Sequence, residues 1–117
     1  MKNLTIRTTA RFQMVDITGD IRKAVRDSEV TSGFCLVFVP HTTAAVTINE
    51  NADPDVSRDI LTGLDKFIPL HDNYRHLEGN AAAHIKASLV GASEQIIIEK
   101  GELVLGTWQS VFFCEFD

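Results

Sequence analysis

Two short polar segments carry most of the side chains in this chain that could do chemistry. The first, residues 41–55, follows the apolar run Phe34–Val39 after a single proline, Pro40. His41 can act as an acid, a base or a metal ligand near neutral pH, and the hydroxyls of Thr42 and Thr43 can donate to anionic oxygens. A His-Thr-Thr run after a buried strand has no evident folding purpose, which favours a functional role. The same segment continues with crowded amides and carboxylates: Asn49, Glu50, Asn51 and Asp53.

The later part of this segment also has a structural interpretation. Asn and Asp are frequent in turns, where their side chains bond to nearby backbone. Asp53 precedes Pro54, and this pair is typical of a helix start, with the aspartate capping free amides and the proline at the first helical position. Both interpretations remain open for Asp53.

The second polar segment, residues 74–84, joins a loop to a predicted helix start. The first-turn amides and the dipole of a helix favour a phosphate or carboxylate, and Gly79 allows close approach. Arg75 could pair with the same anion. The alternative is an ordinary helix with Asn80 as N-cap, and the histidine spacing matches no standard zinc signature. Three side chains here offer metal-ligand atoms: His76, Glu78 and His84.

Hydrophobic periodicity predicts the elements that position these segments. Strands are predicted at residues 4–9, 11–15, 34–39, 42–48 and 96–99, with one or two more between 103 and 116. Helices are predicted at 17–27, with Thr18 as N-cap, at 54–67 and at 80–89, the last ended by Gly91. The uninterrupted apolar run 34–39 suits a strand buried on both faces. Three helices among mostly antiparallel strands favour an α+β fold.

Length and charge restrict the class of protein. The chain has 117 residues, which argues for a single domain over residues 1–117. Sixteen acidic and eleven basic residues give a net charge of −5 with no basic cluster, so no nucleic-acid partner is expected. The longest apolar run is too short to span a membrane, and no signal peptide is evident. A cytoplasmic protein with Cys35 and Cys114 reduced is therefore expected.

These residues resemble the YjbQ family of small, mostly uncharacterised proteins, some of them described as secondary thiamine-phosphate synthases. The resemblance covers nearly the whole chain, with long motifs in the same order. The matching runs are Pro40–Ala45, Asn49–Asp55, Tyr74–His76, Glu78–Asn80, Ala83–Ser88, Gly91, Leu105–Gln109 and Glu115–Asp117.

The resemblance implies a YjbQ-like homotrimer with sites near subunit boundaries, and a transferase that joins a pyrimidine diphosphate to a thiazole phosphate and releases diphosphate. Such chemistry needs an anion cradle and a cation, Mg²⁺ or Zn²⁺, with few protein acids. Residue type and position assign three sets of side chains to it. They are the catalytic residues His41, Glu50 and His84, the substrate-binding residues Thr42, Thr43, Asn49, Arg75, Gly79 and Asn80, and the metal ligands Asp53, His76, Glu78 and His84.

Two other functions would use the same residues. One is a non-catalytic trimer that holds a metal or small ligand, and the other is a set of polar networks that specify trimer assembly. The chain also departs from the family at two places. Members often carry an acidic or polar residue where this chain has Ala82, so a ligand there would be missing. Members usually continue with Gly-Pro-Arg and a further strand after the closing motif, whereas this chain stops at Asp117, so an arginine reaching substrate phosphate would be missing too.

Overall fold

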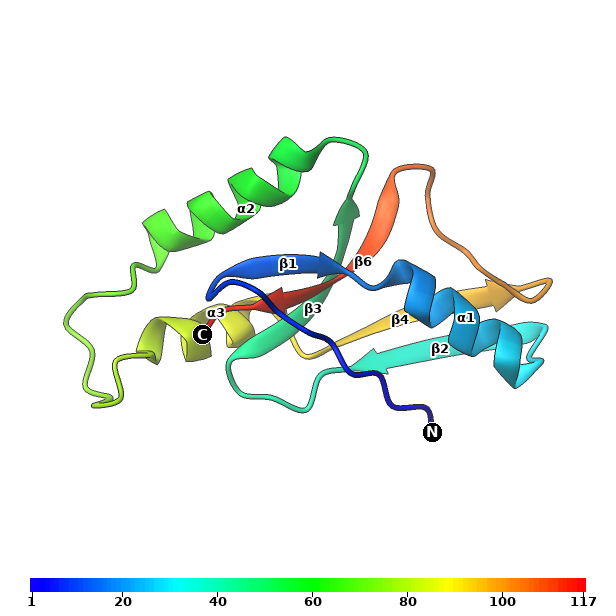
Figure 1. Cartoon of the computed structure of the whole chain (residues 1–117), viewed down its shortest axis with the longest axis horizontal. Helices are drawn as coiled ribbons and strands as arrows, with labels where there is room; N and C mark the ends of the chain where they lie inside the picture. The colour runs from blue at the N-terminus through cyan, green and yellow to red at the C-terminus, as the bar shows by residue number, and fades with distance from the viewer.

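Three helices and six strands make up the computed structural model, which describes residues 1–117 (Figure 1). The strands form two antiparallel three-stranded sheets, which confirms the predicted α+β class. No helix has both the length and the apolar character needed to cross a membrane. In chain order the elements are β1 (Gln13–Asp16), α1 (Thr18–Ser28), β2 (Ser32–Phe38), β3 (Ala44–Glu50), α2 (Pro54–Phe67), α3 (Ala81–Val90), β4 (Ser93–Glu99), β5 (Glu102–Leu103) and β6 (Gln109–Glu115).

The first sheet has the order β1-β6-β3 and the second the order β2-β4-β5. In the first sheet, Ala44 at the start of β3 lies opposite Glu115 at the end of β6. Backbone hydrogen bonds at the junction before β4 join the two sheets. Val46 N donates to Gly91 O over 3.1 Å, and Val39 N donates to Ala92 O over 2.8 Å.

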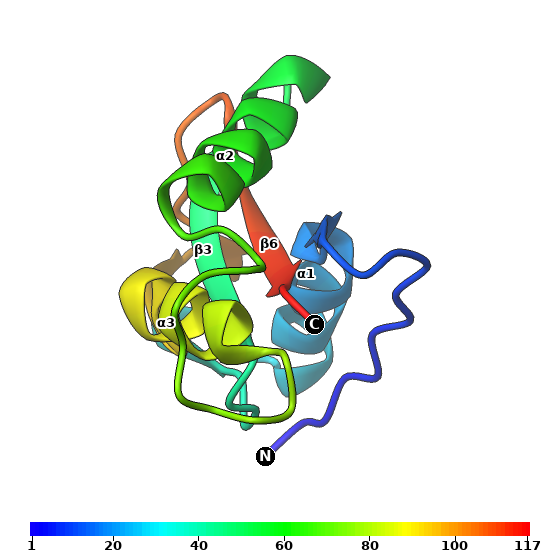
Figure 2. The same ribbon diagram turned by 90° about the vertical axis from the view of Figure 1, so that its left-hand side faces the viewer.

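Successive residues of β3 face two separate hydrophobic clusters, as its alternating sequence predicted. Val46 packs with Ile21 and Val25 of α1, while Ala45 packs with Ala83 and other small residues of α3. Helices α1 and α3 therefore cover opposite sides of the sheet, which Figure 2 shows from the end. This arrangement fixes the start of α3 relative to the start of β3.

Helix α2 begins as its sequence predicted. Asp53 Oδ1 accepts a hydrogen bond from Asp55 N over 2.9 Å, and Pro54 occupies the first turn. The helix lies along the outside of the molecule and contains no fully buried residue (Figure 1). Its last residue, Phe67, is 83% exposed. In a single chain, α2 is held by the packing of Leu61 and Leu64 against the cluster of small residues and by an ion pair between Asp65 and Lys86 of α3.

Three local predictions were wrong, concerning residues 4–9, Thr18 and the burial of β2. Residues 4–9 form no strand, because β1 pairs only with β6 and no partner strand lies beside this segment. Thr18 does not cap α1 from the N-cap position. It is the first helical residue, and its N and Oγ1 both donate to Asp16 Oδ1.

Strand β2 is not buried on both faces. Cys35 and Val37 pack against the core, but the opposite face is uncovered because α1 reaches only one side of this sheet. Phe34, Leu36 and Phe38 are 71%, 61% and 62% exposed, and Ile97 on neighbouring β4 is 62% exposed. We call these four residues the open apolar face.

Candidate functional site

The first polar segment leads directly to the end of β6. Phe116 N donates to Thr43 O over 3.3 Å, next to the pairing of Ala44 with Glu115. The side chains of His41 and Thr42, just before this contact, are exposed and make no hydrogen bond within the chain. They are therefore free to meet a ligand or another chain.

The start of α3 lies at the same end of the sheet. Asn80 Nδ2 donates to Asp117 Oδ2 over 2.9 Å, and Asp117 is also 3.6 Å from the Arg11 guanidinium. Because Phe116 contacts Thr43 and its neighbour Asp117 contacts Asn80, the beginning of the first polar segment and the start of α3 meet at these two residues. The His41–Thr43 run and Asn80 therefore lie at one end of the first sheet.

Asn80 presents an unused acceptor at this helix start. It occupies the N-cap position, yet its side chain bonds to Asp117 rather than capping the helix. Its Oδ1 atom is buried and has no hydrogen-bond partner in the chain. A buried acceptor without a donor is costly, on the order of 1–3 kcal/mol. The N–H groups of Ala81 and Ala82 also have no acceptor within the chain. The Asn80 oxygen and these two N–H groups together form a small polar surface. It suits a ligand that both accepts and donates hydrogen bonds.

The loop before α3 and the first turn of that helix carry three of the four predicted metal ligands. His76 Nε2 is 3.9 Å from Glu78 Oε2, and the His76 and His84 rings lie 5.2 Å apart at nearly a right angle. Asp53 precedes the start of α2, and the helix of 14 residues, about 20 Å long, separates it from the loop that leads to His76. No three His, Cys, Asp or Glu side chains of the chain form a ready-made metal-holding group.

Backbone conformation and one tyrosine hydroxyl hold this loop. Gly79 has φ +80°, in the left-handed region that other residues adopt only with strain. Tyr74 Oη donates to Pro69 O over 2.6 Å. Burial, together with the nearby negative charge of Asp72, raises the pKa of Tyr74. Arg75 follows it with an exposed side chain that makes no ion pair within the chain.

Asn49, Glu50 and Asn51 lie at the opposite end of β3. The strand is seven residues long, so Glu50 is about 20 Å from Ala44 at the start of β3 in the same chain. Asn49 Oδ1 accepts from Glu50 N, and Asn51 Nδ2 donates to Asp16 Oδ2 over 2.6 Å. The interaction between Asn51 and Asp16 joins the end of β3 to the start of α1, which is a structural task.

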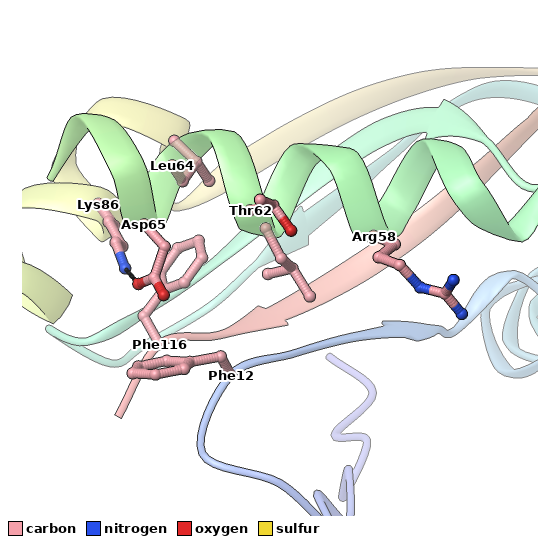
Figure 3. A pocket seen from close by; sticks show the side chains of 8 residues that line it. Phe12, Arg58, Thr62, Leu64, Asp65, Lys86 and Phe116 are labelled. Carbon is pink, nitrogen blue, oxygen red and sulfur yellow. Dashed lines mark hydrogen bonds and ion pairs between the residues drawn. The ribbon is translucent and has the colours of Figure 1, made fainter. Parts of the chain in front are cut away.

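The sequence analysis missed a cavity of about 220 Å³ beneath α2 (Figure 3). Lys86 of α3 is buried beside it, with Nζ 2.6 Å from Asp65 Oδ1 and 4.9 Å from the centroid of the Phe12 ring. Spacing could have indicated this burial, because Lys86 lies three and four positions after the core residues Ala83 and Ala82. The cavity is lined by Phe12, Arg58, Leu61, Thr62, Leu64, Asp65, Lys86 and Phe116.

Comparison with known proteins places the chain in a family. Residues 2–117 match the model of the UPF0047 protein YjbQ-like family. The chain is 52% identical to the UPF0047 protein YugU of Bacillus subtilis over all of its own length and 89% of that protein. It is 54% identical to the UPF0047 protein MJ1081 of Methanocaldococcus jannaschii over 96% of its length and 81% of that protein.

Solved structures show the same fold. A YjbQ/UPF0047 protein of Clostridium acetobutylicum superposes with a TM-score of 0.94 at 59% identity, over 96% of this chain and 87% of that one. A protein of unknown function from Sulfolobus solfataricus gives a TM-score of 0.92 at 37% identity, over 96% of this chain and 82% of that one. With a family match over nearly its whole length and relatives above half identity, the chain belongs to the YjbQ-like UPF0047 family.

Proposed function

We propose that this protein is a cytoplasmic enzyme that acts on a phosphorylated small molecule held at the start of α3, with thiamine-phosphate synthesis as the specific reaction. The observation that carries the proposal is the unpaired polar surface at Asn80, where a buried oxygen and two free amides lie after Gly79. Backbone amides at a helix start bind phosphate oxygens well. Asn80 Oδ1 would accept a hydrogen bond from a hydroxyl or a protonated phosphate oxygen of the same ligand.

The other residues predicted for the site would offset the negative charge of the bound phosphate and move protons. When the substrate's carbon–oxygen bond breaks, the departing diphosphate keeps the electron pair, so groups that stabilise negative charge speed the step. Arg75 lies in the loop before the helix and has no partner in the chain that would compete for it. His41 and His84 would bind phosphate oxygens or move protons. A cation near His76, Glu78 and His84 would neutralise phosphate charge, and two imidazoles with one carboxylate suit Zn²⁺ better than Mg²⁺.

The proposal includes a homotrimer. The open apolar face of β2 and β4 is the kind of exposed hydrophobic surface that marks a protein interface. Assembly would also account for the separation of the predicted site residues. Glu50 and Asp53 lie far from His41 in their own chain, and a neighbouring chain would bring its copies of these residues to a shared site.

A non-catalytic metal- or ligand-binding trimer is the second candidate. The observation that favours it is that His76 lies near two other possible ligands, 3.9 Å from a Glu78 oxygen and 5.2 Å between ring centroids from His84. Metal content of protein purified without chelators, compared with a His76→Ala variant, addresses this function directly. Stoichiometric zinc lost in the variant, from a protein without transferase activity, would favour it.

The test of the enzyme proposal is thiamine-phosphate formation by the purified protein with Mg²⁺, the pyrimidine diphosphate and the thiazole phosphate. We expect product with the wild type and a loss of at least tenfold with Asn80→Ala and with His41→Ala. Asn73→Ala is the matched control, because Asn73 lies in the same loop and its side chain makes no hydrogen bond. Wild-type rates in both site variants, or no product from folded wild-type protein, would reject the proposal.

A further inference from the structure

Strand β2 is an outer strand of its sheet, and its free edge has no partner strand in the chain. We propose that this edge pairs, through backbone hydrogen bonds, with residues 4–9 of a second copy of the chain. We call residues 4–9 the N-terminal segment. The inference rests on the homotrimer of the proposed function for the number of copies and says how the copies join, but it does not depend on the phosphate site.

The hydrogen bonds of the second sheet show which backbone groups of β2 remain free. Val39 N donates to Ala92 O over 2.8 Å, which continues the register of β2 and β4. In an antiparallel pair, every second residue directs its N–H and C=O groups toward the partner strand, and the residues between direct theirs away. The backbone groups of Phe34, Leu36 and Phe38 therefore point away from β4, and no other strand of the chain reaches them.

This free edge is long, apolar and uncovered. Strand β2 has seven residues, and the side chains of the same three residues belong to the open apolar face. Figure 1 shows β2 at the border of its sheet, beside β4. A long, exposed, hydrophobic edge strand is a template for pairing with another chain. The edge therefore needs a strand that its own sheet does not provide.

The N-terminal segment has a strand-forming sequence and an unpaired backbone. Its β-branched residues Thr5, Ile6, Thr8 and Thr9 favour extended backbone. It nevertheless belongs to no sheet, and the N–H and C=O groups of residues 4–8 make no hydrogen bond within the chain. Figure 2 shows it on the outside of the molecule. Within the segment only Ile6 packs against the core cluster next to α1, so the backbone is available to a neighbour.

The segment and the β2 edge do not meet within one chain. Thr9 N donates to Gln13 Oε1 over 2.9 Å, and Gln13 Nε2 donates to Thr9 Oγ1 over 3.2 Å, which holds the end of the segment at β1. In the order β1-β6-β3, β3 is the strand joined to the second sheet, so β1 lies at the far edge of the first. One copy can thus supply the strand that the next copy lacks. Because such a contact joins two different surfaces, it can close into a ring of copies, as a trimer requires.

The charges of the two surfaces are complementary. Residues 1–9 carry Lys2 and Arg7 and no carboxylate side chain, and Arg7 forms no ion pair within the chain. Strands β2, β4 and β5 carry no lysine or arginine. They carry three carboxylates instead: Glu94, Glu99 and Glu102. Opposite charge across an interface favours this pair of surfaces over the pairing of two β2 edges with each other.

The test is hydrogen–deuterium exchange of the full chain, followed by NMR at several protein concentrations, with the mass measured by light scattering. We expect the amides of Phe34, Leu36 and Phe38 to exchange at least tenfold more slowly in the trimer than at concentrations where the protein is monomeric. A Thr5→Pro, Thr8→Pro double variant removes one N–H from each edge of the segment. Neither N–H is bonded within the chain, so the variant should fold, lose this protection and assemble at least tenfold more weakly.

A matched Thr5→Ala, Thr8→Ala variant removes the same side chains, keeps both N–H groups and should retain wild-type protection. The amides of Val46 and Val111, which are hydrogen-bonded within the chain, report on the fold in each case. Protection that does not depend on concentration would assign the β2 edge to its own chain, and equal protection in the proline variant would assign it to another strand. Either result overturns the inference. A trimer with unprotected β2 amides would overturn the inference alone, whereas a monomer at every concentration would overturn the proposed trimer as well.

Discussion

Asn80 at the start of α3 donates a hydrogen bond to Asp117 after the end of β6, over 2.9 Å and across 37 positions of sequence. This single contact joins the helix start to the sheet edge that carries Thr43. It also fixes the orientation of the Asn80 amide, so that Oδ1 rather than Nδ2 is left without a partner. The polar surface proposed to bind phosphate therefore depends on Asp117.

Replacing Asp117 tests that dependence. Asp117→Ala removes the acceptor and frees the Asn80 amide to rotate, so we expect at least tenfold weaker binding of inorganic diphosphate and a loss of about 1 kcal/mol in the free energy of unfolding. Calorimetric titration and urea unfolding measure the two effects. Asp59→Ala, an exposed carboxylate with no ion pair, should change neither. Unchanged diphosphate affinity in Asp117→Ala would show that the contact does not organise the site.

The two partners of the buried ion pair should respond unequally to substitution. Lys86→Met places an apolar side chain of similar length in a buried position and leaves Asp65, which is 47% exposed, in contact with water. We expect the free energy of unfolding to stay within about 1 kcal/mol of wild type. Asp65→Ala leaves the buried ammonium without its partner and should cost about 3 kcal/mol. Equal losses in the two variants by urea unfolding would contradict this asymmetry.

Two glycines provide a matched pair for backbone strain. Gly79 has φ +80°, so Gly79→Ala should destabilise the protein by about 1 kcal/mol or more even though no atom blocks the added methyl group. Gly63 lies within α2 with open space around it, so Gly63→Ala should stabilise by about 0.5–1 kcal/mol. Thermal unfolding of both variants measures the difference in sign. The same sign for both would refute the assignment of strain to Gly79.

The open apolar face predicts the behaviour of the assembly. Leu36→Asp places a charge in the centre of this face, so we expect a trimeric wild type and a monomeric or destabilised variant. Leu77→Asp is the control, because Leu77 is 98% exposed in a loop away from that face. Light scattering after size-exclusion chromatography gives both masses. A trimer that persists in Leu36→Asp would place the interface elsewhere.

The two thiols should be unreactive in the folded protein. Burial raises the pKa of Cys114 from 9.0 to about 12, and burial also raises the pKa of Cys35. Iodoacetamide at pH 8 should therefore alkylate both much more slowly than it alkylates the unfolded chain. The unfolded state loses the Cys114 proton above pH 9 while the folded state keeps it, so unfolding should become easier between pH 9 and 12. A Cys114→Ala variant should show a weaker decline over that range.

Local signals in the sequence were enough to predict most elements. Asp53-Pro54 predicted the start of α2, Gly91 the end of α3, and the alternation in β3 the two faces it presents. The open face of β2 could not be predicted from the sequence. A continuous apolar run has the same pattern whether the second face of the strand is covered by the core of the same chain or by another chain.

The site was predictable only in part, for a similar reason. The polar runs around His41 and Asn80 stood out by residue type, and the structure places them at one end of the sheet. Lys86 was missed because its burial depends on Phe12 and Asp65, which come from other elements, and only folding brings them together. The position of Glu50 relative to His41 likewise depends on the strand between them.

The absence of any fully buried residue in α2 has a consequence for exchange with solvent. Regions with few buried contacts open locally at a much lower free energy than the whole domain. The backbone amides of α2 should thus exchange with deuterium well before those of β3 and β6, whose residues Val46 and Val111 are completely inaccessible. Since α2 forms one wall of the cavity, a molecule could enter and leave while the rest of the domain stays folded.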